Sequence, residues 1–222
     1  MRPPVSYHLY VLDYNYSSWS MRAGILLRFA GVEFSETRLH LDGPGREQLR
    51  KISGSGLLPL LDHDGLKIWD SLAIAEYLAE QLPEKPFWPK DREARALARA
   101  ASAEMHSGFA AMRAAMSMNI RAHYPGFPRT PEVDRNARRV QALWTELRTR
   151  FGAGGPYLCG EFGIVDAMFA PVVMRFRTYD VKLTGVCAEY AAALEAHPAV
   201  QGWLAKVRED TFHVVDYDLI RD

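Results

Sequence analysis

Residues 56–82 read GLLPLLDHDGLKIWDSLAIAEYLAEQL, a segment in which one apolar periodicity gives way to another. Two short apolar runs flank Asp64-Gly65, a pair typical of the tight turn of a β-hairpin. Pro59 stands at the start of the first run, a place where proline is tolerated because it need not donate to the strand ladder. Over residues 71–82, apolar positions recur at helical spacing, and a proline follows. The segment predicts a hairpin followed by a helix.

The residues before this segment add a strand, a helix and a second strand. Residues 6–12 are apolar and rich in aromatic side chains, and residues 33–41 also have extended character. Between them, apolar positions recur at helical spacing over residues 18–30, and Gly31 supplies a stop signal. The polar residues 42–56, which contain glycine and proline, are expected to form a loop. A strand–helix–strand unit leading into a hairpin predicts a small α/β domain with a mixed sheet.

The residues after the segment have a different character. Residues 91–123 are rich in alanine and carry an apolar helical stripe, and Ser107-Gly108 in their middle permit a bend. We therefore expect the chain to divide at a proline-rich linker into an α/β domain and an all-helical domain. The predicted boundaries are 1–83 for the first domain, 84–90 for the linker and 91–222 for the second domain. Further helices are expected over residues 131–151, 164–178, 186–196 and 198–209.

Composition and charge narrow the class of protein. Lysine plus arginine number 27, as do aspartate plus glutamate, so no overall field draws the chain to nucleic acid or to an anionic membrane. No apolar run approaches the roughly 20 residues of a membrane span, and residues 1–5 lack the apolar centre of a signal peptide. Cys159 and Cys187 are too few for a disulfide framework, and neither they nor the histidines show metal-ligand spacing. We expect a soluble, cytoplasmic protein without a metal ion, a nucleic-acid partner or a membrane partner.

Two expected helix starts carry hydroxyl or carboxylate side chains. Ser17 and Ser18 come directly at the start of the first helix, and Asp70-Ser71 open the helix after the hairpin. These side chains suit N-capping, because they satisfy backbone N–H groups that have no partner within the helix. The same N–H groups and the helix dipole also favour an anion, such as a thiolate or a carboxylate. Each pair taken alone fits both interpretations.

In their order and spacing, these motifs resemble those of the glutathione S-transferase family, in particular its bacterial, serine-type members. The resemblance extends over nearly the whole chain and implies a thioredoxin-like first domain, a helical-bundle second domain and a homodimer. Four stretches carry it: YSSWSMR (16–22), like the family's catalytic turn; GLLPLL (56–61), like its cis-proline turn; IWDSLAIAEYLAEQL (68–82), like the helix that holds the γ-glutamyl end of glutathione; and GEFGIVDAMFAPV (160–172), like the start of the core helix of its second domain.

The resemblance also implies roles for single residues. Ser17 matches the catalytic hydroxyl, and Asp166 matches a structural cap, although Gly163 stands where the family has serine or threonine. The backbone of Leu58 would pair with the cysteinyl part of glutathione, and Asp70 and Ser71 would bind its γ-glutamyl amine and carboxylate. The implied glutathione-binding residues are Ser17, Ser18, Leu58, a cis Pro59, Asp70 and Ser71. Whether Ser17, Ser18 or a tyrosine contacts the sulfur stays open, the tyrosine candidates being Tyr7, Tyr10, Tyr14 and Tyr16.

The implied activity is that of a detoxifying transferase, in which the thiolate of glutathione attacks a small apolar electrophile. One alternative is a glutathione-dependent isomerase similar to maleylacetoacetate isomerase. Those enzymes have a motif like SSCS at the catalytic turn, whereas this chain has Trp19 in place of the cysteine. Another is a binding protein of the same fold whose catalysis has lapsed. A cysteine-based thiol reductase is disfavoured, because Ser17 occupies the position of the reactive cysteine.

The electrophile pocket is expected between the two domains, where ligand sites are common. Residues 104–121 are rich in methionine, an adaptable apolar side chain, and are the best candidate for its wall. For any single methionine at helical spacing, a place in the core is the alternative. The predicted pocket residues are Tyr14, Met105, His106, Met112 and Arg113.

Overall fold

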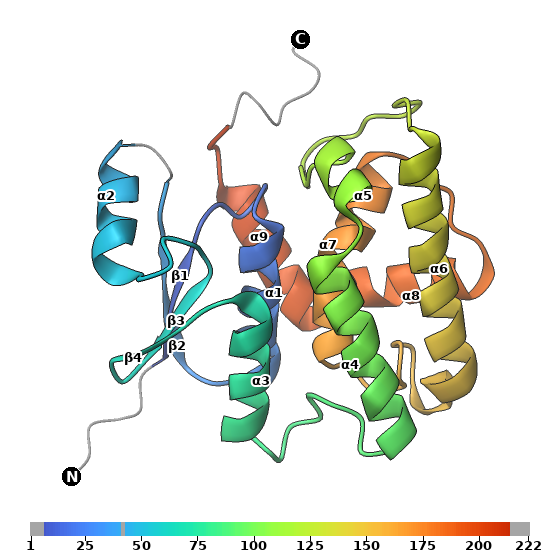
Figure 1. The fold of residues 1–222 in the computed structure, drawn as a ribbon, viewed down its shortest axis with the longest axis horizontal. Helices are drawn as coiled ribbons and strands as arrows, with labels where there is room; N and C mark the ends of the chain where they lie inside the picture. Colours follow the sequence, from blue (N-terminus) through green and yellow to red (C-terminus); the bar gives the residue numbers. More distant parts are fainter. Residues whose placement is uncertain (1–6, 41–42, 214–222) are drawn as a thin grey trace.

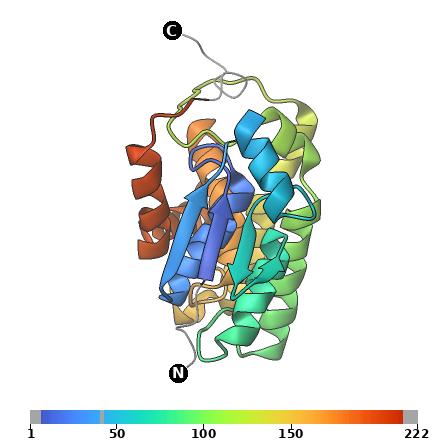
Figure 2. The same ribbon diagram turned by 90° about the vertical axis from the view of Figure 1, so that its left-hand side faces the viewer.

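Four strands form one mixed sheet in the computed structural model of the chain, which describes residues 7–40 and 43–213. The order across the sheet is β2-β1-β3-β4, with β1 and β2 parallel and the other neighbours antiparallel. This confirms the predicted mixed sheet, whose strands Figure 2 shows in front of the helices that cover one face. The strands are β1 (Tyr7–Val11), β2 (Phe34–Arg38), β3 (Leu60–His63) and β4 (Leu66–Ile68).

The β3–β4 hairpin has the local geometry that its sequence predicts. Asp64 and Gly65, the two turn residues, both have positive φ angles, of 52° and 90°. This is the region that a two-residue hairpin turn requires, and it favours the Asp-Gly pair. The peptide bond before Pro59 is cis, as the family resemblance implies. Residues 56–59 therefore turn sharply just before β3 begins at Leu60.

Three helices accompany the sheet, and one of them is missed by the sequence analysis. Helices α1 (Ser18–Ala30) and α3 (Ser71–Gln81) lie where their caps and periodicity predict. The loop predicted over residues 42–56 is wrong, because α2 (Gly43–Ile52) occupies most of it. Its glycine and proline residues fall in the first turn, where proline is well tolerated, and good helix formers follow. The sequence favours a loop because Leu49 and Ile52 are the only aliphatic side chains of α2, which leaves hardly any apolar stripe.

The rest of the chain is helical, as predicted. The expected bend at Ser107-Gly108 is a full break, since α4 ends at Ser107 and Phe109 has a positive φ of 57° before the next helix starts. Among the described residues, no helix is both long and apolar enough to cross a membrane. The helices are α4 (Arg92–Ser107), α5 (Ala110–Ala115), α6 (Pro131–Phe151), α7 (Ile164–Thr178), α8 (Gly185–Ala196) and α9 (Pro198–Glu209), with a short 3-10 turn η1 (Gly152–Gly154) after α6.

Helix α1 joins the sheet to the helical part of the molecule. It lies between the strands and helices α7 and α9 in Figure 1 and contacts both of these helices. Its apolar side chains belong to one continuous hydrophobic core that runs from β1 to α9. Side chains at the start of α1 can therefore reach groups from both parts of the chain. The domain boundaries at residues 84–90 stay a prediction.

A glycine allows α9 to pack closely against the middle of α1. A Cβ atom added to Gly24 would lie 2.3 Å from Cζ3 of Trp203, well inside van der Waals contact. The indole has little freedom to move away, because it is fully buried and its Nε1–H donates to the carbonyl of Tyr14 at 3.0 Å. The absence of a side chain at residue 24 is thus a packing requirement.

We expect Gly24→Ala to lower the free energy of unfolding by up to about 2 kcal/mol. Overpacking a filled core costs about 1–3 kcal/mol, which outweighs the roughly 1 kcal/mol that alanine gains over glycine as a helix former. Thermal unfolding followed by circular dichroism measures the change. Gly54→Ala is the matched control, because a Cβ atom there meets nothing within 4 Å. If Gly24→Ala melts at or above the wild-type temperature, the packing described here is wrong.

Candidate functional site

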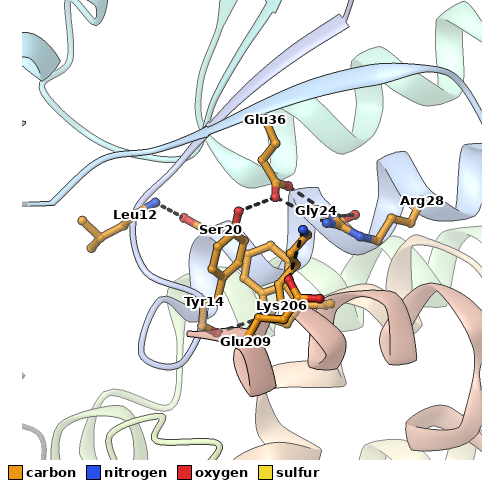
Figure 3. A network of polar contacts seen from close by, with 9 residues as sticks. Leu12, Tyr14, Ser20, Gly24, Arg28, Glu36, Lys206 and Glu209 are labelled. Atoms are coloured by element: carbon orange, nitrogen blue, oxygen red, sulfur yellow. Dashed lines mark hydrogen bonds and ion pairs between the residues drawn. The ribbon is translucent and has the colours of Figure 1, made fainter. Parts of the chain in front are cut away.

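Ser17 is the N-cap of α1, and its hydroxyl both accepts and donates a hydrogen bond there. The Ser17 Oγ accepts from the backbone N–H of Ser20 at 3.2 Å and donates to the Ser20 Oγ at 2.9 Å. The Ser20 hydroxyl also accepts from the N–H of Leu12 at 3.0 Å, which ties the helix start to the end of β1 (Figure 3). Ser17 is buried. The structure thus gives Ser17 the capping geometry that its sequence position also allows.

Ser18, the first residue of α1, contacts a buried arginine of α7, far away in the sequence. The Nη2 of Arg175, in α7, donates to the Ser18 Oγ at 3.3 Å, while the Arg175 Nε donates to the carbonyl of Met116 at 2.8 Å. Both Ser18 and Arg175 are buried. A guanidinium has donors only, so the Ser18 oxygen accepts and its own hydrogen remains available for another acceptor.

Asp70 caps α3 with one carboxylate oxygen and binds a histidine with the other. Its Oδ1 accepts from the N–H groups of Leu72 and Ala73 at 2.9 and 3.3 Å. Its Oδ2 lies 2.9 Å from the Nε2 of His106, the next-to-last residue of α4. The neighbouring Ser71 is fully buried, and its Oγ has no hydrogen-bond partner among the described residues. The carboxylate is therefore held in place, and a free hydroxyl lies beside it.

Three arginines gather behind these two helix starts, and we call Arg22, Arg113 and Arg175 the arginine cluster. The guanidinium groups of Arg22 and Arg113 lie 4.5 and 5.5 Å from the ring centre of Trp19. The same indole meets the ring of His106 at 5.2 Å, and the Arg113 Nη1 donates to the carbonyl of His106 at 3.0 Å. Side chains from α1, α4 and α5 thus meet around one tryptophan, and Arg175 of α7 interacts electrostatically with both Arg22 and Arg113.

The cluster holds more positive charge than the described residues around it balance. Burial lowers the pKa of Arg22 to about 9, and the charges of Arg175 and Arg113 add to the effect, while Asp70 opposes it. The Arg22 side chain is completely buried, and its Nε and Nη1 have no hydrogen-bond partner among the described residues. Burial also lowers the pKa of Arg175, to about 10. Both guanidinium groups remain charged at neutral pH, so an anion here would be stabilised.

The backbone of Leu58, just before β3, is the next part of the candidate site. Leu58 makes no backbone hydrogen bond within the described part of the chain, and the register of β3 against β1 begins only at Leu60. Among the described residues its N–H and C=O groups therefore have no partner, which is the condition for pairing with the backbone of a peptide. The pairing itself, like the roles of Ser17, Ser18, Asp70 and Ser71, stays a prediction.

The tyrosine alternatives lie in other networks. The Tyr14 hydroxyl donates to Glu36 at 2.6 Å, and Glu36 also binds Arg28 at 3.2 Å, as Figure 3 shows. Burial, with the Glu36 carboxylate beside it, raises the pKa of Tyr14 further above its usual value. Tyr7 stacks on the ring of His63 at 4.0 Å. The rings of Tyr10 and Tyr16 contact His8 at 4.3 Å and the guanidinium of Arg121 at 5.9 Å, respectively.

The five predicted pocket residues lie in three different places in the structure. His106 and Arg113 lie around Trp19, as described above. Met105 and Met112 are completely buried members of the core, the alternative that helical spacing also allows. Tyr14 belongs to the Glu36 network. A hollow of about 270 Å³ between the linker and α7, lined by residues such as Trp88, Phe151 and Cys159, includes none of the five. The position of the electrophile pocket stays a prediction.

Asp166 has the geometry of a cap at the start of α7. Its Oδ2 accepts from the N–H of Gly163 at 2.9 Å, and its Oδ1 accepts from the N–H of Leu158 at 3.1 Å. Complete burial raises its pKa to about 7, against the opposing effect of these two hydrogen bonds. The glycine that departs from the family pattern has a steric reason, because a Cβ at residue 163 would lie 2.7 Å from the carbonyl oxygen of Phe87.

Neither cysteine chemistry nor a metal centre emerges from the described residues. Burial raises the pKa of the Cys159 thiol to about 12, which disfavours the thiolate that redox chemistry needs. No three His, Cys, Asp or Glu side chains in the described part of the chain come together in a way that could hold a metal ion. The predicted absence of a metal stays a prediction.

The sequence analysis missed Arg22 and Arg175 as members of the site. A signal was present, because each arginine interrupts an apolar run of a helix, in SMRAGILL and in PVVMRF. A charged residue inside a buried helix is rare unless it is paired or functional. The sequence shows Trp19 only as a departure from the isomerase pattern, whereas in the structure its ring contacts Arg22, Arg113 and His106.

Two family models match the chain, one in each part. Residues 16–81 match the N-terminal domain of glutathione S-transferases, and residues 130–206 match the C-terminal domain. Glutathione S-transferase GstB of Escherichia coli K12 is 29% identical over 164 residues, which is 70% of each chain. A probable maleylacetoacetate isomerase of Caenorhabditis elegans is 37% identical over 91 residues.

The similarity to the isomerase is partial, and the similarity to solved structures is more extensive. The match covers 41% of this chain and 42% of the C. elegans protein, so this chain spans less than half of that relative. A Burkholderia glutathione transferase homologue, solved with bound glutathione, has a TM-score of 0.73 at 24% identity. The match covers 92% of this chain and 100% of the homologue. A Tau class glutathione S-transferase from mango has a TM-score of 0.69 at 22% identity, over 89% of this chain and 91% of its own. These structures share the fold.

Proposed function

The chain belongs to the glutathione S-transferase family, and on that premise we propose that it is a glutathione transferase acting on small electrophiles. The observation that carries the proposal is the arginine cluster beside the starts of α1 and α3, together with a Leu58 backbone that has no partner among the described residues. Glutathione has a peptide backbone, an amine, two carboxylates and a thiol. The groups in this region are complementary to each of these.

In the proposed complex, the γ-glutamyl end of glutathione lies at the start of α3. Asp70 binds the amine, and Ser71 binds the carboxylate with its own backbone N–H and with its hydroxyl, which has no partner among the described residues. The contact between Asp70 and His106 supports this placement, because it fixes the carboxylate without consuming all of its acceptor capacity. Leu58 pairs with the cysteinyl backbone, and the sulfur lies at the start of α1, beside Ser17 and Ser18.

The proposed chemistry asks for a modest stabilisation of the thiolate. A free thiol has a pKa near 8.5. Lowering this pKa by about two requires the site to stabilise the thiolate over the thiol by roughly 2.7 kcal/mol. One hydrogen bond from a hydroxyl to the charged sulfur supplies about 1.5–3 kcal/mol, and the dipole of α1 adds about 0.3–1 kcal/mol. The thiol proton leaves to solvent. The thiolate then forms a carbon–sulfur bond with the electrophile, whose leaving group departs with its bonding electrons.

A glutathione-dependent isomerase is the second candidate. The relatives called maleylacetoacetate isomerases, from Caenorhabditis elegans and Dictyostelium discoideum, are each 37% identical to this chain over part of its length. The arginine cluster also suits a substrate that bears a carboxylate. Trp19 argues for the transferase, because its large ring fills the place that those enzymes give to a small cysteine side chain.

Calorimetric titration with glutathione, followed by two activity assays, tests the proposal. We expect heat of binding, and then conjugation of a chlorodinitrobenzene faster than isomerisation of a cis-alkenyl diketo acid. Faster isomerisation would select the second candidate. Binding without either reaction would select a binding protein whose catalysis has lapsed. A protein that binds no glutathione contradicts the proposed function altogether.

We also propose that the protein is a cytoplasmic homodimer, as the resemblance implies. Three large apolar side chains near the hairpin support a contact surface, since Leu57, Leu66 and Trp69 are 64%, 55% and 48% exposed. Light scattering coupled to size-exclusion chromatography measures the mass. A single species at the monomer mass would contradict the dimer.

A further inference from the structure

We propose that His106 belongs to the glutathione half of the site, where it positions Asp70 and makes the affinity for glutathione depend on its own protonation. This role rests on the proposed function, in which Asp70 binds the γ-glutamyl amine. It moves His106 away from the expected wall of the electrophile pocket. His106 is a positioning residue, because it acts through Asp70 and touches no reacting atom.

One contact joins the end of α4 to the start of α3. The Nε2 of His106 lies 2.9 Å from the Oδ2 of Asp70. The Oδ1 of Asp70 accepts from the N–H groups of Leu72 and Ala73 at 2.9 and 3.3 Å. Both oxygens of the carboxylate are thus held, so its orientation is set before a ligand arrives.

The carboxylate of Asp70 is nevertheless accessible to a ligand. The Asp70 side chain is 46% exposed, whereas the His106 side chain is 24% exposed and its Nδ1 is buried. A carboxylate offers about four acceptor positions, and the contacts to Leu72, Ala73 and His106 occupy three of them. An ammonium group can therefore reach Asp70 from the solvent side while His106 holds it from the protein side.

The neutral and the charged imidazole act differently on this carboxylate. In either form, an N–H at Nε2 can donate to Asp70 and keep its orientation. The charged imidazolium also balances the negative charge that the ligand's amine requires, and it repels the ammonium group. The neutral form of His106 therefore supports binding of the amine, and the charged form opposes it.

Charged groups face this contact from several elements. The arginine cluster, from α1, α5 and α7, is positive, and its Arg113 donates to the carbonyl of His106 at 3.0 Å. On the α6 side, Arg139 is already bound to Glu104 of α4 at 2.7 Å. A cation at His106 would add to the positive charge of the cluster and would draw on Asp70 for its balance. The imidazolium and the ligand's amine therefore compete for the same carboxylate.

This competition gives the affinity a pH dependence of definite sign. A ligand that prefers the neutral form of His106 must release a proton when it binds to the charged form, and by the same linkage a proton weakens its binding. The affinity should therefore rise with pH in the range where histidine generally titrates, between about pH 5 and 8. The released proton goes to solvent, and no covalent bond forms.

Calorimetric titration with S-methylglutathione between pH 5 and pH 7 tests this role. The probe keeps the amine and both carboxylates of glutathione, but it has no thiol whose ionisation would also release a proton. For wild type, we expect the Kd at pH 5 to be about 5-fold or more larger than at pH 7, because two unit charges at contact distance repel each other even at the dielectric constant of water. Titrations in two buffers with different ionisation enthalpies should show that a proton is released.

Three variants assign the effect to His106. His106→Gln keeps an N–H that can donate to Asp70 but has no titratable group, so its Kd should be nearly constant over this pH range. His106→Ala cannot hold the carboxylate and should bind more weakly than His106→Gln at pH 7. His123→Gln is the matched control, because His123 also interacts with a carboxylate, that of Asp180, outside the proposed site. It should keep the pH dependence of wild type.

The outcomes separate this role from the proposed function. If the Kd of wild type is constant from pH 5 to pH 7, or if His106→Gln keeps the dependence, the role of His106 is wrong while the proposed function stands. If His106→Gln does not fold, nuclear magnetic resonance of the His106 ring in wild type decides, since the bound probe must disfavour the charged ring. A wild type that binds neither glutathione nor the probe contradicts the proposed function, and this role fails with it.

Discussion

Replacing Asp166 with alanine is expected to lower the free energy of unfolding by about 2 to 6 kcal/mol. The carboxylate accepts from the N–H groups of Gly163 and Leu158, and all of this occurs in the completely buried start of α7. Alanine would leave both N–H groups buried without an acceptor, at about 1–3 kcal/mol each. Chemical denaturation monitored by circular dichroism and by tryptophan fluorescence measures the loss.

Two further variants make this result specific to the buried cap. Asp166→Asn keeps one acceptor oxygen and should lose less stability than the alanine variant. Asp91→Ala removes an exposed N-cap, which accepts from the N–H of Ala94 at 2.8 Å, and should cost only about 1 kcal/mol. Equal losses in Asp166→Ala and Asp91→Ala would show that burial does not strengthen the cap.

The same residue gives the stability a pH dependence of known sign. Burial raises the pKa of Asp166 from 3.8 to about 7 in the folded chain. A group with a raised folded-state pKa contributes stability fully below its unfolded pKa, and this contribution is lost as the pH rises through the folded-state pKa. The unfolding free energy of wild type relative to Asp166→Asn should therefore fall between about pH 4 and pH 7. A difference that is constant over this window contradicts the raised pKa.

Replacing Asp70 with alanine is expected to weaken glutathione binding by about 10-fold to 150-fold. In the proposed complex, its carboxylate binds the ligand's ammonium group, and a hydrogen bond of this charged kind is worth about 1.5–3 kcal/mol. Asp70 is also held by His106, so the site loses a preorganised group rather than a mobile one. Calorimetric titration of the variant against wild type measures the change in Kd.

The control for Asp70 must separate binding from capping. Asp91→Ala removes a comparable N-cap from α4, outside the proposed site, and should leave the Kd for glutathione as in wild type. Asp70→Asn retains an oxygen that can accept from Leu72 and Ala73 but loses the charge. We expect it to fold as well as wild type and to bind nearly as weakly as Asp70→Ala. If Asp70→Ala binds as tightly as Asp91→Ala, the γ-glutamyl end lies elsewhere.

Elements defined by local chemistry were predictable from the sequence. The hairpin follows from Asp64-Gly65, and α1 and α3 follow from a cap, a periodic stripe and a stop. Helix α7 was also predicted at Ile164–Thr178, because its capping aspartate and its apolar run are adjacent in the chain. Helix α2 was not, since it buries too little for periodicity to reveal it.

The composition of the site was only partly predictable, because much of it depends on which helix faces meet. Periodicity shows that α1 and α7 each have a buried face, but it does not show that Ser18 on one meets Arg175 on the other. The break at Phe109 redirects the chain between His106 and Arg113, and no sequence pattern reveals that both then contact Trp19. The resemblance matches Ser17 to the catalytic hydroxyl, but the different hydrogen-bond partners of Ser17 and Ser18 appear only in the structure.

The bond between Ser18 and Arg175 joins residues 157 positions apart. On the proposed placement of glutathione, a chimera that transplants the sheet and its first helices onto the bundle of a relative would keep Leu58, Asp70 and Ser71. It would lose the guanidinium that binds the Ser18 hydroxyl at the start of α1. The start of α1 is therefore completed by the helical part of the chain, and an exchange of bundles should be tested for a changed thiol pKa as well as for a changed electrophile preference.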